Sequence, residues 1–208
     1  MIQRPSWLLP VSATRLLPAC VLALMLLTAA PASAHHLMEL FHLQPSPLAG
    51  LMSGIGHPLL GPDHLIFLLA LALVGLQRSS RWMIALLVVG LLGTLVGLTT
   101  PQLPGADLLL ALTLVVEGLV VIGRLPTLLL VPCFALHGYG LSAPVLGWDA
   151  ASTASYVLGL LLSQAALLLL SLGLLRNGAM ALAPSTRALL AGGLIGIGAA
   201  FGWSLIVP

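Results

Sequence analysis

The chain alternates between long apolar stretches and short connections that hold most of its polar side chains. A membrane interior offers backbone groups no hydrogen-bond partner, so apolar stretches of this length are stable there only as helices. We therefore predict an all-α integral membrane protein, a bundle of six transmembrane helices. The stretches cover residues 48–76, 82–98, 108–122, 125–141, 154–175 and 188–207.

The composition agrees with a chain that is surrounded by lipid. Apolar residues make up 60% of the sequence and charged residues 6%, whereas a soluble domain has about 25% charged residues. The formal net charge is only +2, so there is no basic patch for nucleic acid. A soluble enzyme, a nucleic-acid-binding protein and a disordered chain are excluded. The lipid bilayer is the first predicted partner.

The first 34 residues follow the order of a secretory signal peptide. Arg4 and Arg15 precede an apolar run at 16–27, and the small residues of 28–34 follow it. The apolar run is shorter than the roughly 20 residues that a membrane span needs. We expect cleavage after Ala34, which gives a signal peptide (1–34) and a transmembrane domain (35–208). An uncleaved anchor helix is the alternative.

All basic residues beyond the signal peptide lie on connections after the first, third or fifth predicted span. They are Arg78, Arg81, Arg124, Arg176 and Arg187. Basic connections of multi-pass proteins stay in the cytoplasm. We therefore predict that the mature N-terminus and the C-terminus both face outward.

Ionisable side chains on three predicted spans lie at the same depth. His64, Glu117 and His137 are each about 12 residues, or about 18 Å, from a span end, and Asp63 adjoins His64. Burying a charge at this depth is costly unless it is neutralised, paired or bound to metal. Mixed imidazole and carboxylate groups suit borderline divalent metals. There are alternatives to metal binding. The same groups could form a proton relay or a structural ion pair, and His137 taken alone could be a hydrogen-bonded core histidine.

Two prolines interrupt the first predicted span. Pro58 and Pro62 lack the N–H groups that would bond the carbonyls of Gly54 and of Pro58 itself, so we predict a kink. In a straight helix His57 and His64 would share a face but stand about 10.5 Å apart. A kink would bring both histidines towards one ion, although a purely structural kink explains the prolines equally well.

A second cluster follows the predicted cleavage site. It comprises His35, His36, Glu39 and His42. Imidazoles, a carboxylate and the free amine of residue 35 could capture a cation outside the membrane. Polar residues at a solvated chain end are the competing interpretation.

The segment GHPLLGPDHLIFLL at 56–69 resembles the signature of the HupE/UreJ family of bacterial nickel permeases, in which a histidine, five residues and Asp-His lie in the first mature span. The resemblance implies metal binding or translocation for His57, Asp63 and His64. It also implies a location in the bacterial cytoplasmic membrane and a link to hydrogenase or urease maturation.

Three shorter segments are also similar to parts of this family. Residues 103–107 end in Asp107 where the family usually has Glu, and residues 134–138 contain His137 in a second histidine motif. Glu117 with Gly118 resembles an intramembrane Glu of a related branch. If the chain is a permease, we expect His57 and Asp107, which are nearer the outer face, to be entry ligands and the mid-depth group to be the selectivity or transfer site.

The leading hypothesis is a permease for nickel, with cobalt as the second choice. The metal is then the cargo, and no permanently bound cofactor is expected. The sequence has no Walker-type loop, so we expect no ATP hydrolysis and no enzyme activity. The alternatives are an intramembrane metalloenzyme with Glu117 as general base, and a non-transporting accessory or sensor subunit. The sequence leaves open a homo-oligomer or an accessory partner.

Overall fold

A computed structural model describes residues 44–177 and 183–207 of the chain. The chain divides into two units, residues 1–30 and 31–208, and every described residue belongs to the second. The predicted signal peptide lies outside the described residues, and so do the predicted capture residues His35, His36, Glu39 and His42. Both remain predictions.

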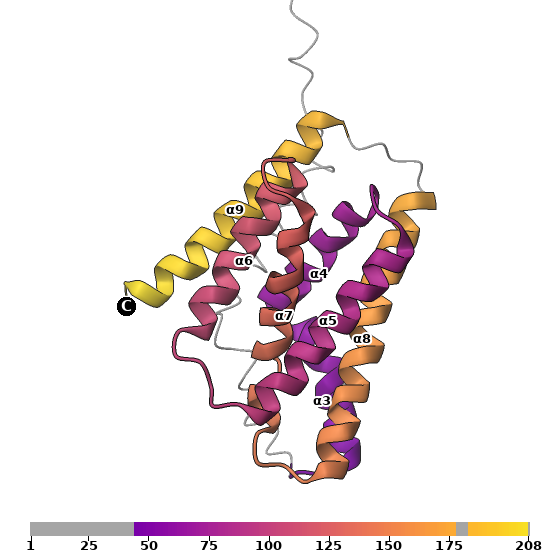
Figure 1. The fold of residues 1–208 in the computed structure, drawn as a ribbon, viewed down its shortest axis with the longest axis vertical. Coiled ribbons are helices and arrows are strands. Elements are labelled where there is room, and N and C mark those ends of the chain that lie inside the picture. Colours follow the sequence, from indigo (N-terminus) through magenta and orange to yellow (C-terminus); the bar gives the residue numbers. More distant parts are fainter. Residues whose placement is uncertain (1–43, 178–182, 208) are drawn as a thin grey trace, which may run out of the picture. The chain divides into compact units, whose positions relative to one another are not determined.

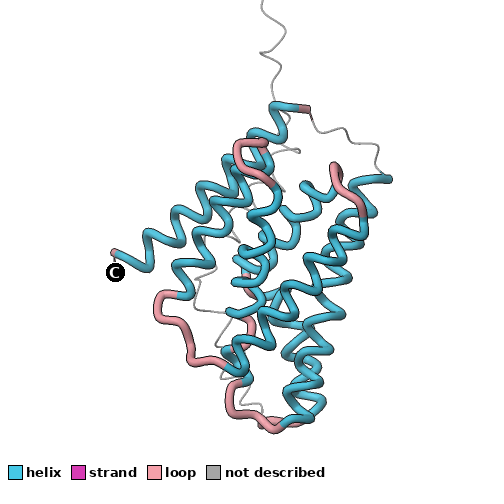
Figure 2. Tube along the Cα trace, in the orientation of Figure 1, coloured by secondary structure: helices cyan, strands magenta, loops and turns pink. Residues whose placement is uncertain are grey.

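In the described part of the chain, every regular element is a helix, and short loops connect them (Figures 1 and 2). The α-helices are α3 (Pro47–Leu60), α4 (Pro62–Gly75), α5 (Ser80–Thr99), α6 (Ala106–Val121), α7 (Leu130–Gly140), α8 (Ala150–Asn177) and α9 (Pro184–Ile206). Short 3-10 turns, η2 (Thr127–Leu129) and η3 (Ala143–Val145), flank α7. Each of the six predicted apolar stretches therefore folds as helix, the first as two pieces.

Four helical segments are long and apolar enough to cross a membrane. They are Ser80–Thr99, Thr127–Val145, Ala150–Arg176 and Pro184–Ile206. Helices α3 and α4 give a fifth candidate if the bent pair counts as one span. Helix α6 has only 16 residues, about 24 Å of helix, against a membrane core about 30 Å thick. The chain is a multi-pass membrane protein with four or five candidate spans, and the sixth span remains a prediction.

Polar side chains fix where several helices begin. Ser46 accepts a hydrogen bond from the Ala49 N–H at the start of α3, and Ser79 accepts one from the Trp82 N–H at the start of α5. Before α8, Asp149 accepts bonds from the N–H groups of residues 151 and 152 and from the Ser152 hydroxyl. These bonds, above all those from Ser152, hold the pKa of the Asp149 carboxyl below its ordinary value.

Glycines bring α3 and α8 into backbone contact. A Cβ atom on Gly50 would collide with the carbonyl oxygen of Ser152, and one on Gly54 would collide with that of Tyr156. Helix α8 runs beside α3 and α5 in Figure 1, and α9 packs on α6. Small residues permit this close approach in membranes, where packing rather than the hydrophobic effect holds helices together. The contact sets Tyr156 against the end of α3.

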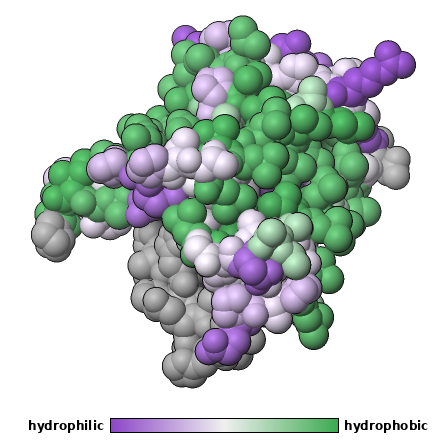
Figure 3. All heavy atoms as spheres, turned by 60° about the horizontal axis from the view of Figure 1, so that its bottom comes forward, coloured by the Kyte–Doolittle hydropathy of each residue, from purple (hydrophilic) through white to green (hydrophobic). Residues whose placement is uncertain are grey.

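Large apolar side chains lie both inside the bundle and on its outside. Phe67, Leu71, Met83, Leu114 and Phe134 are buried and form a core between α4, α5, α6 and α7. Others stay exposed, among them Leu170, Leu174, Leu189 and Trp203. In Figure 3, apolar residues cover the middle of the face drawn, and hydrophilic residues lie along its top edge and in its lower part. An apolar exterior over a packed interior is what a lipid-facing helix bundle requires.

Candidate metal centre

The first predicted span breaks between α3 and α4, which meet at Gly61 with a bend of 71°. The backbone of Gly61 is extended, and its N–H donates to the His57 carbonyl at 2.9 Å. Pro62 is the first residue of α4, and at this position a helix does not need the backbone N–H that proline lacks. The predicted kink is confirmed, but it falls at 61–62, and Pro58 stays inside α3.

A hydroxyl group from another helix compensates for Pro58. Proline has no N–H for the carbonyl of Gly54 one turn earlier. The Ser163 hydroxyl of α8 lies 3.2 Å from that oxygen and 3.3 Å from the Leu160 carbonyl of its own helix, so it shares its one proton between them. Both residues are buried. The irregular backbone is therefore supported by protein at this point, as the membrane interior requires.

Three imidazole rings from three helices lie in a row at this break. The ring centroids of His57 and His64 are 5.3 Å apart, and those of His64 and His137 are 5.2 Å apart. All three side chains are buried, with exposed fractions of 7%, 5% and 1%. Asp63 lies beside the middle ring, with its Oδ2 atom 3.7 Å from His64 Nε2. The structure brings together these four predicted site residues.

The row is not a closed metal cage. Among the residues that the structure describes, no group of three or more His, Cys, Asp or Glu side chains is placed to hold a metal ion. The rings of His57 and His64 meet edge to face, at 75°. The bend places the rings of His57 and His64 side by side, and their joint binding of one ion stays a prediction.

Glu117 forms no hydrogen bond to the histidine row. Its side chain is fully buried in α6, and neither carboxyl oxygen has a hydrogen-bond partner among the described residues. Helix α6 packs against α4 and α7, which carry His64 and His137. A buried carboxylate without a partner is costly, so Glu117 must be protonated or gain a cation.

Asp107 lies away from the buried groups. It occupies the first turn of α6 and is exposed. An acidic side chain is favourable at a helix N-terminus whatever its other role. Its predicted part in metal entry remains a prediction.

Sequence analysis did not single out two polar residues that contact the histidines. The Tyr156 hydroxyl of α8 lies 2.9 Å from His57 Nδ1 and donates to the Leu141 carbonyl at 2.7 Å. Thr113 Oγ1 of α6 lies 2.9 Å from His137 Nε2. The only available signal was a hydroxyl inside an apolar stretch, and it does not reveal which other helix supplies the partner.

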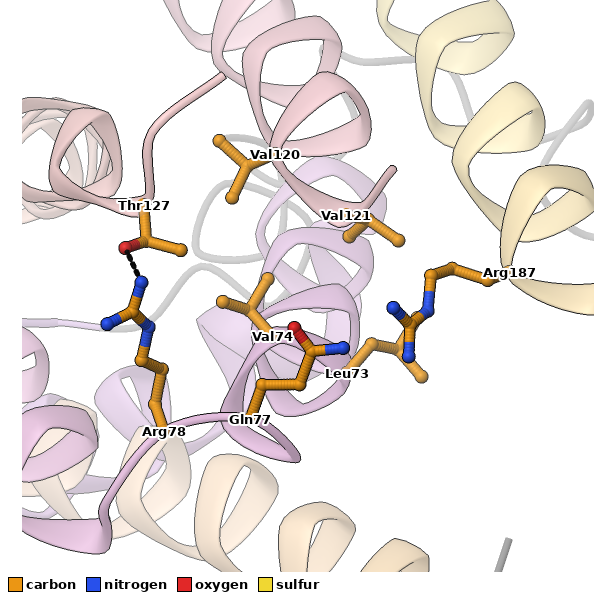
Figure 4. A pocket seen from close by; sticks show the side chains of 8 residues that line it. All are labelled: Leu73, Val74, Gln77, Arg78, Val120, Val121, Thr127 and Arg187. Atoms are coloured by element: carbon orange, nitrogen blue, oxygen red, sulfur yellow. Dashed lines mark hydrogen bonds between the residues drawn. The ribbon is translucent and has the colours of Figure 1, made fainter. Parts of the chain in front are cut away.

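Two hollows of the bundle lie away from the histidines. A cavity of about 30 Å³ is lined by Leu73, Val74, Gln77, Arg78, Val120, Val121, Thr127 and Arg187 (Figure 4). Arg78 donates to Thr127 at 2.6 Å, and the Gln77 amide oxygen, suitably turned, accepts from Arg187. A groove of about 580 Å³ between α5 and α8 is mainly apolar. No histidine or acidic side chain lines either hollow.

The fold and the buried polar row define a multi-pass helical membrane protein with polar groups at a broken span. The chain matches the family model described as HupE / UreJ protein over residues 22–201. The chain therefore belongs to the HupE/UreJ family, which confirms the resemblance seen in the 56–69 segment. A search of curated proteins and a search of solved structures each found no match.

Proposed function

We propose that the chain is a six-span permease that carries a divalent transition metal, nickel first and cobalt second, across the bacterial cytoplasmic membrane for metalloenzyme maturation. The observation that supports this best is the row of His57, His64 and His137 at the break between α3 and α4. Ionisable groups are rare inside membranes and mark ion pathways when they occur. Imidazole with carboxylate is a donor set that suits nickel and cobalt.

The serial arrangement favours passage over storage. A closed cage with four ligands would hold an ion tightly, whereas adjacent sites with few ligands each allow it to enter and leave. His64 contacts both neighbouring rings and Asp63. We assign to it the transfer of metal between an outer position at His57 and an inner position at His137.

The other predicted residues take their places around this row. Asp107 and the cluster of His35, His36, Glu39 and His42 are proposed to collect the ion outside the membrane. Asp63 and Glu117 supply carboxylates that offset its charge at depth. Transport is driven by gradients and by trapping of the metal inside the cell, because the sequence has no nucleotide-binding loop.

An intramembrane metalloenzyme is less well supported. A catalytic metal site keeps three protein ligands around one ion and an open position for water. The described residues hold no such group, and Glu117 makes no hydrogen bond to any of the three imidazoles. The sequence also lacks a helical His-Glu-x-x-His pair.

The test is metal entry into liposomes that contain the purified full-length chain and an internal metal-sensitive dye. Nickel, cobalt, copper and zinc are offered separately, and protein-free liposomes serve as the control. We expect entry of nickel, and more slowly of cobalt, above the control rate. Binding of nickel to the protein without any entry would overturn the permease and leave a metal-binding accessory or sensor subunit. Entry of copper or zinc alone would overturn the choice of metal.

A further inference from the structure

A histidine can bind a metal through only one ring nitrogen at a time, and a hydrogen bond to the other nitrogen decides which one is available. Both outer members of the histidine row have such a bond. Thr113 contacts His137, and Tyr156 contacts His57. Both hydroxyl residues are buried, with exposed fractions of 3% and 0%.

The Thr113 hydroxyl has one proton, and its geometry shows where that proton goes. Oγ1 donates to the carbonyl of Leu110 at 2.6 Å, and a carbonyl oxygen can only accept. Towards His137 the hydroxyl must therefore accept, which makes Nε2 of the ring the donor at 2.9 Å. The lone pair of a neutral His137 then lies on Nδ1, which is buried and bonds to no described residue.

Tyr156 imposes the opposite choice on His57. Its single hydroxyl proton is donated to the Leu141 carbonyl at 2.7 Å. The oxygen can only accept from His57, so Nδ1 of that ring is the donor at 2.9 Å. Metal binding by His57 must then use Nε2.

We infer that Thr113 and Tyr156 are positioning residues that select Nδ1 of His137 and Nε2 of His57 as the nitrogens offered to a divalent metal. The selection is built into the fold, because each hydroxyl is held by a backbone carbonyl. The Phe67 ring packs against His137 at a tilt of 52°, with the ring centroids 3.9 Å apart, and limits rotation of the imidazole as well. The functional role of this selection rests on the proposed metal path. The tautomers themselves can be measured without any metal.

The experiment records two-bond ¹H–¹⁵N spectra of the metal-free, full-length chain in lipid nanodiscs with ¹⁵N-labelled histidine. These spectra separate the two neutral tautomers. We expect the Nε2–H form for His137 and the Nδ1–H form for His57 in the unaltered protein. The opposite form at either ring of the unaltered protein would overturn the assignment.

Variants then test the cause. Thr113→Val should move His137 away from the pure Nε2–H form, whereas Thr113→Ser should keep it. Tyr156→Phe should likewise release His57 and leave His137 unchanged. Thr94→Val and Tyr139→Phe are matched controls, because their hydroxyls bond to the carbonyls of Gly138 and Pro101 instead of to a histidine. Unchanged tautomers in the folded Thr113→Val and Tyr156→Phe proteins would overturn the inference.

Nickel titration separates this inference from the proposed function. Loss of a partner that orients a metal-binding histidine typically costs 10–100-fold in affinity, so we expect about that loss for Thr113→Val and near-normal binding for Thr113→Ser. Equal affinities in these two proteins would overturn the positioning role. No nickel binding by the unaltered chain, with the tautomers as assigned, would instead overturn the proposed metal path.

Discussion

The Ser163 hydroxyl of α8 lies 3.2 Å from the Gly54 carbonyl oxygen of α3, at the position where Pro58 has no N–H to offer, and shares its proton with the Leu160 carbonyl at 3.3 Å. The proline therefore costs the helix less than it would in isolation, because a neighbouring helix supplies the missing donor. The same contact ties α8 to the helix that ends three residues beyond His57. The turn of α3 around Pro58 thus has support from a residue more than a hundred positions away.

Removing this donor should destabilise the protein. Ser163→Ala leaves the Gly54 carbonyl buried and without a partner, which costs about 1–3 kcal/mol. Adding Pro58→Ala restores an N–H one turn later, so the double variant should regain part of the loss. Reversible unfolding in mixed micelles measures both changes.

Ser155→Ala is the control for that experiment, because its hydroxyl bonds to Ala151 within α8 and joins no second helix. We expect it to stay within about 0.5 kcal/mol of the unaltered protein. Equal effects of Ser163→Ala and Ser155→Ala would contradict the role of Ser163 beside Pro58.

The contact between α3 and α8 should tolerate no extra methyl group. Gly54→Ala places a Cβ against the backbone carbonyl of Tyr156, which forces the helices apart and costs about 1–3 kcal/mol or more. Gly192→Ala on α9 meets nothing within 4 Å, so it should be neutral or stabilise by up to about 1 kcal/mol. Thermal unfolding of the two variants compares them, and a harmless Gly54→Ala would show that the helices are not in backbone contact.

Asp149 should make stability depend on pH in the acid range. Its carboxyl has a pKa below the ordinary value of 3.8, because Ser152 and the backbone at the start of α8 donate to the charged form. A lowered pKa in the folded state means stabilisation that is complete above about pH 4 and disappears as pH falls through the folded value. Asp149→Ala should therefore be less stable than the unaltered protein at pH 7.

Asp149→Asn is the matched control, because an amide oxygen can still accept the capping bonds without titrating. Unfolding of the three proteins from pH 7 down to pH 2 would show the difference between Asp149 and Ala shrinking at the acid end. A difference that stays constant over the whole range would contradict the charged cap.

Glu117 should matter for transport more than for folding. Its carboxyl is buried and bonds to no described residue, so Glu117→Gln removes no hydrogen bond and should leave the free energy of unfolding equal or higher. Nickel entry should nevertheless fall, because the amide cannot offset the charge of the ion. Liposome entry and unfolding are measured on the same preparation, and undiminished entry would remove Glu117 from the proposed path.

The helices and the core of the site follow from the sequence, because both are encoded locally. Apolar length predicts each helix, and the spacing from His57 to His64 with two prolines between them predicts a break. The exact position of the break depends on Gly61, whose extended backbone takes the bend, and Ser163 supports the turn of α3 around Pro58. Neither contribution shows in the proline pattern itself.

The partners of the histidines could not be predicted in the same way. Tyr156 is 99 positions from His57, and Thr113 is 24 from His137. Only helix packing decides which hydroxyl meets which ring, and a single sequence does not encode that packing in any short spacing. Local sequence also predicts the number of spans only incompletely. The apolar stretch at 108–122 predicts a helix, but it does not show how deeply that helix inserts into the membrane.

The most direct test of the central claim is the rate of nickel entry into liposomes that contain the unaltered chain, His64→Ala or Leu69→Ala. His64 is the middle ring of the row, whereas Leu69 lies on the same helix α4 with an exposed side chain. We expect Leu69→Ala to transport normally and His64→Ala, shown to fold, to lose at least about tenfold in rate. Equal rates for all three proteins would contradict a metal path through the histidine row.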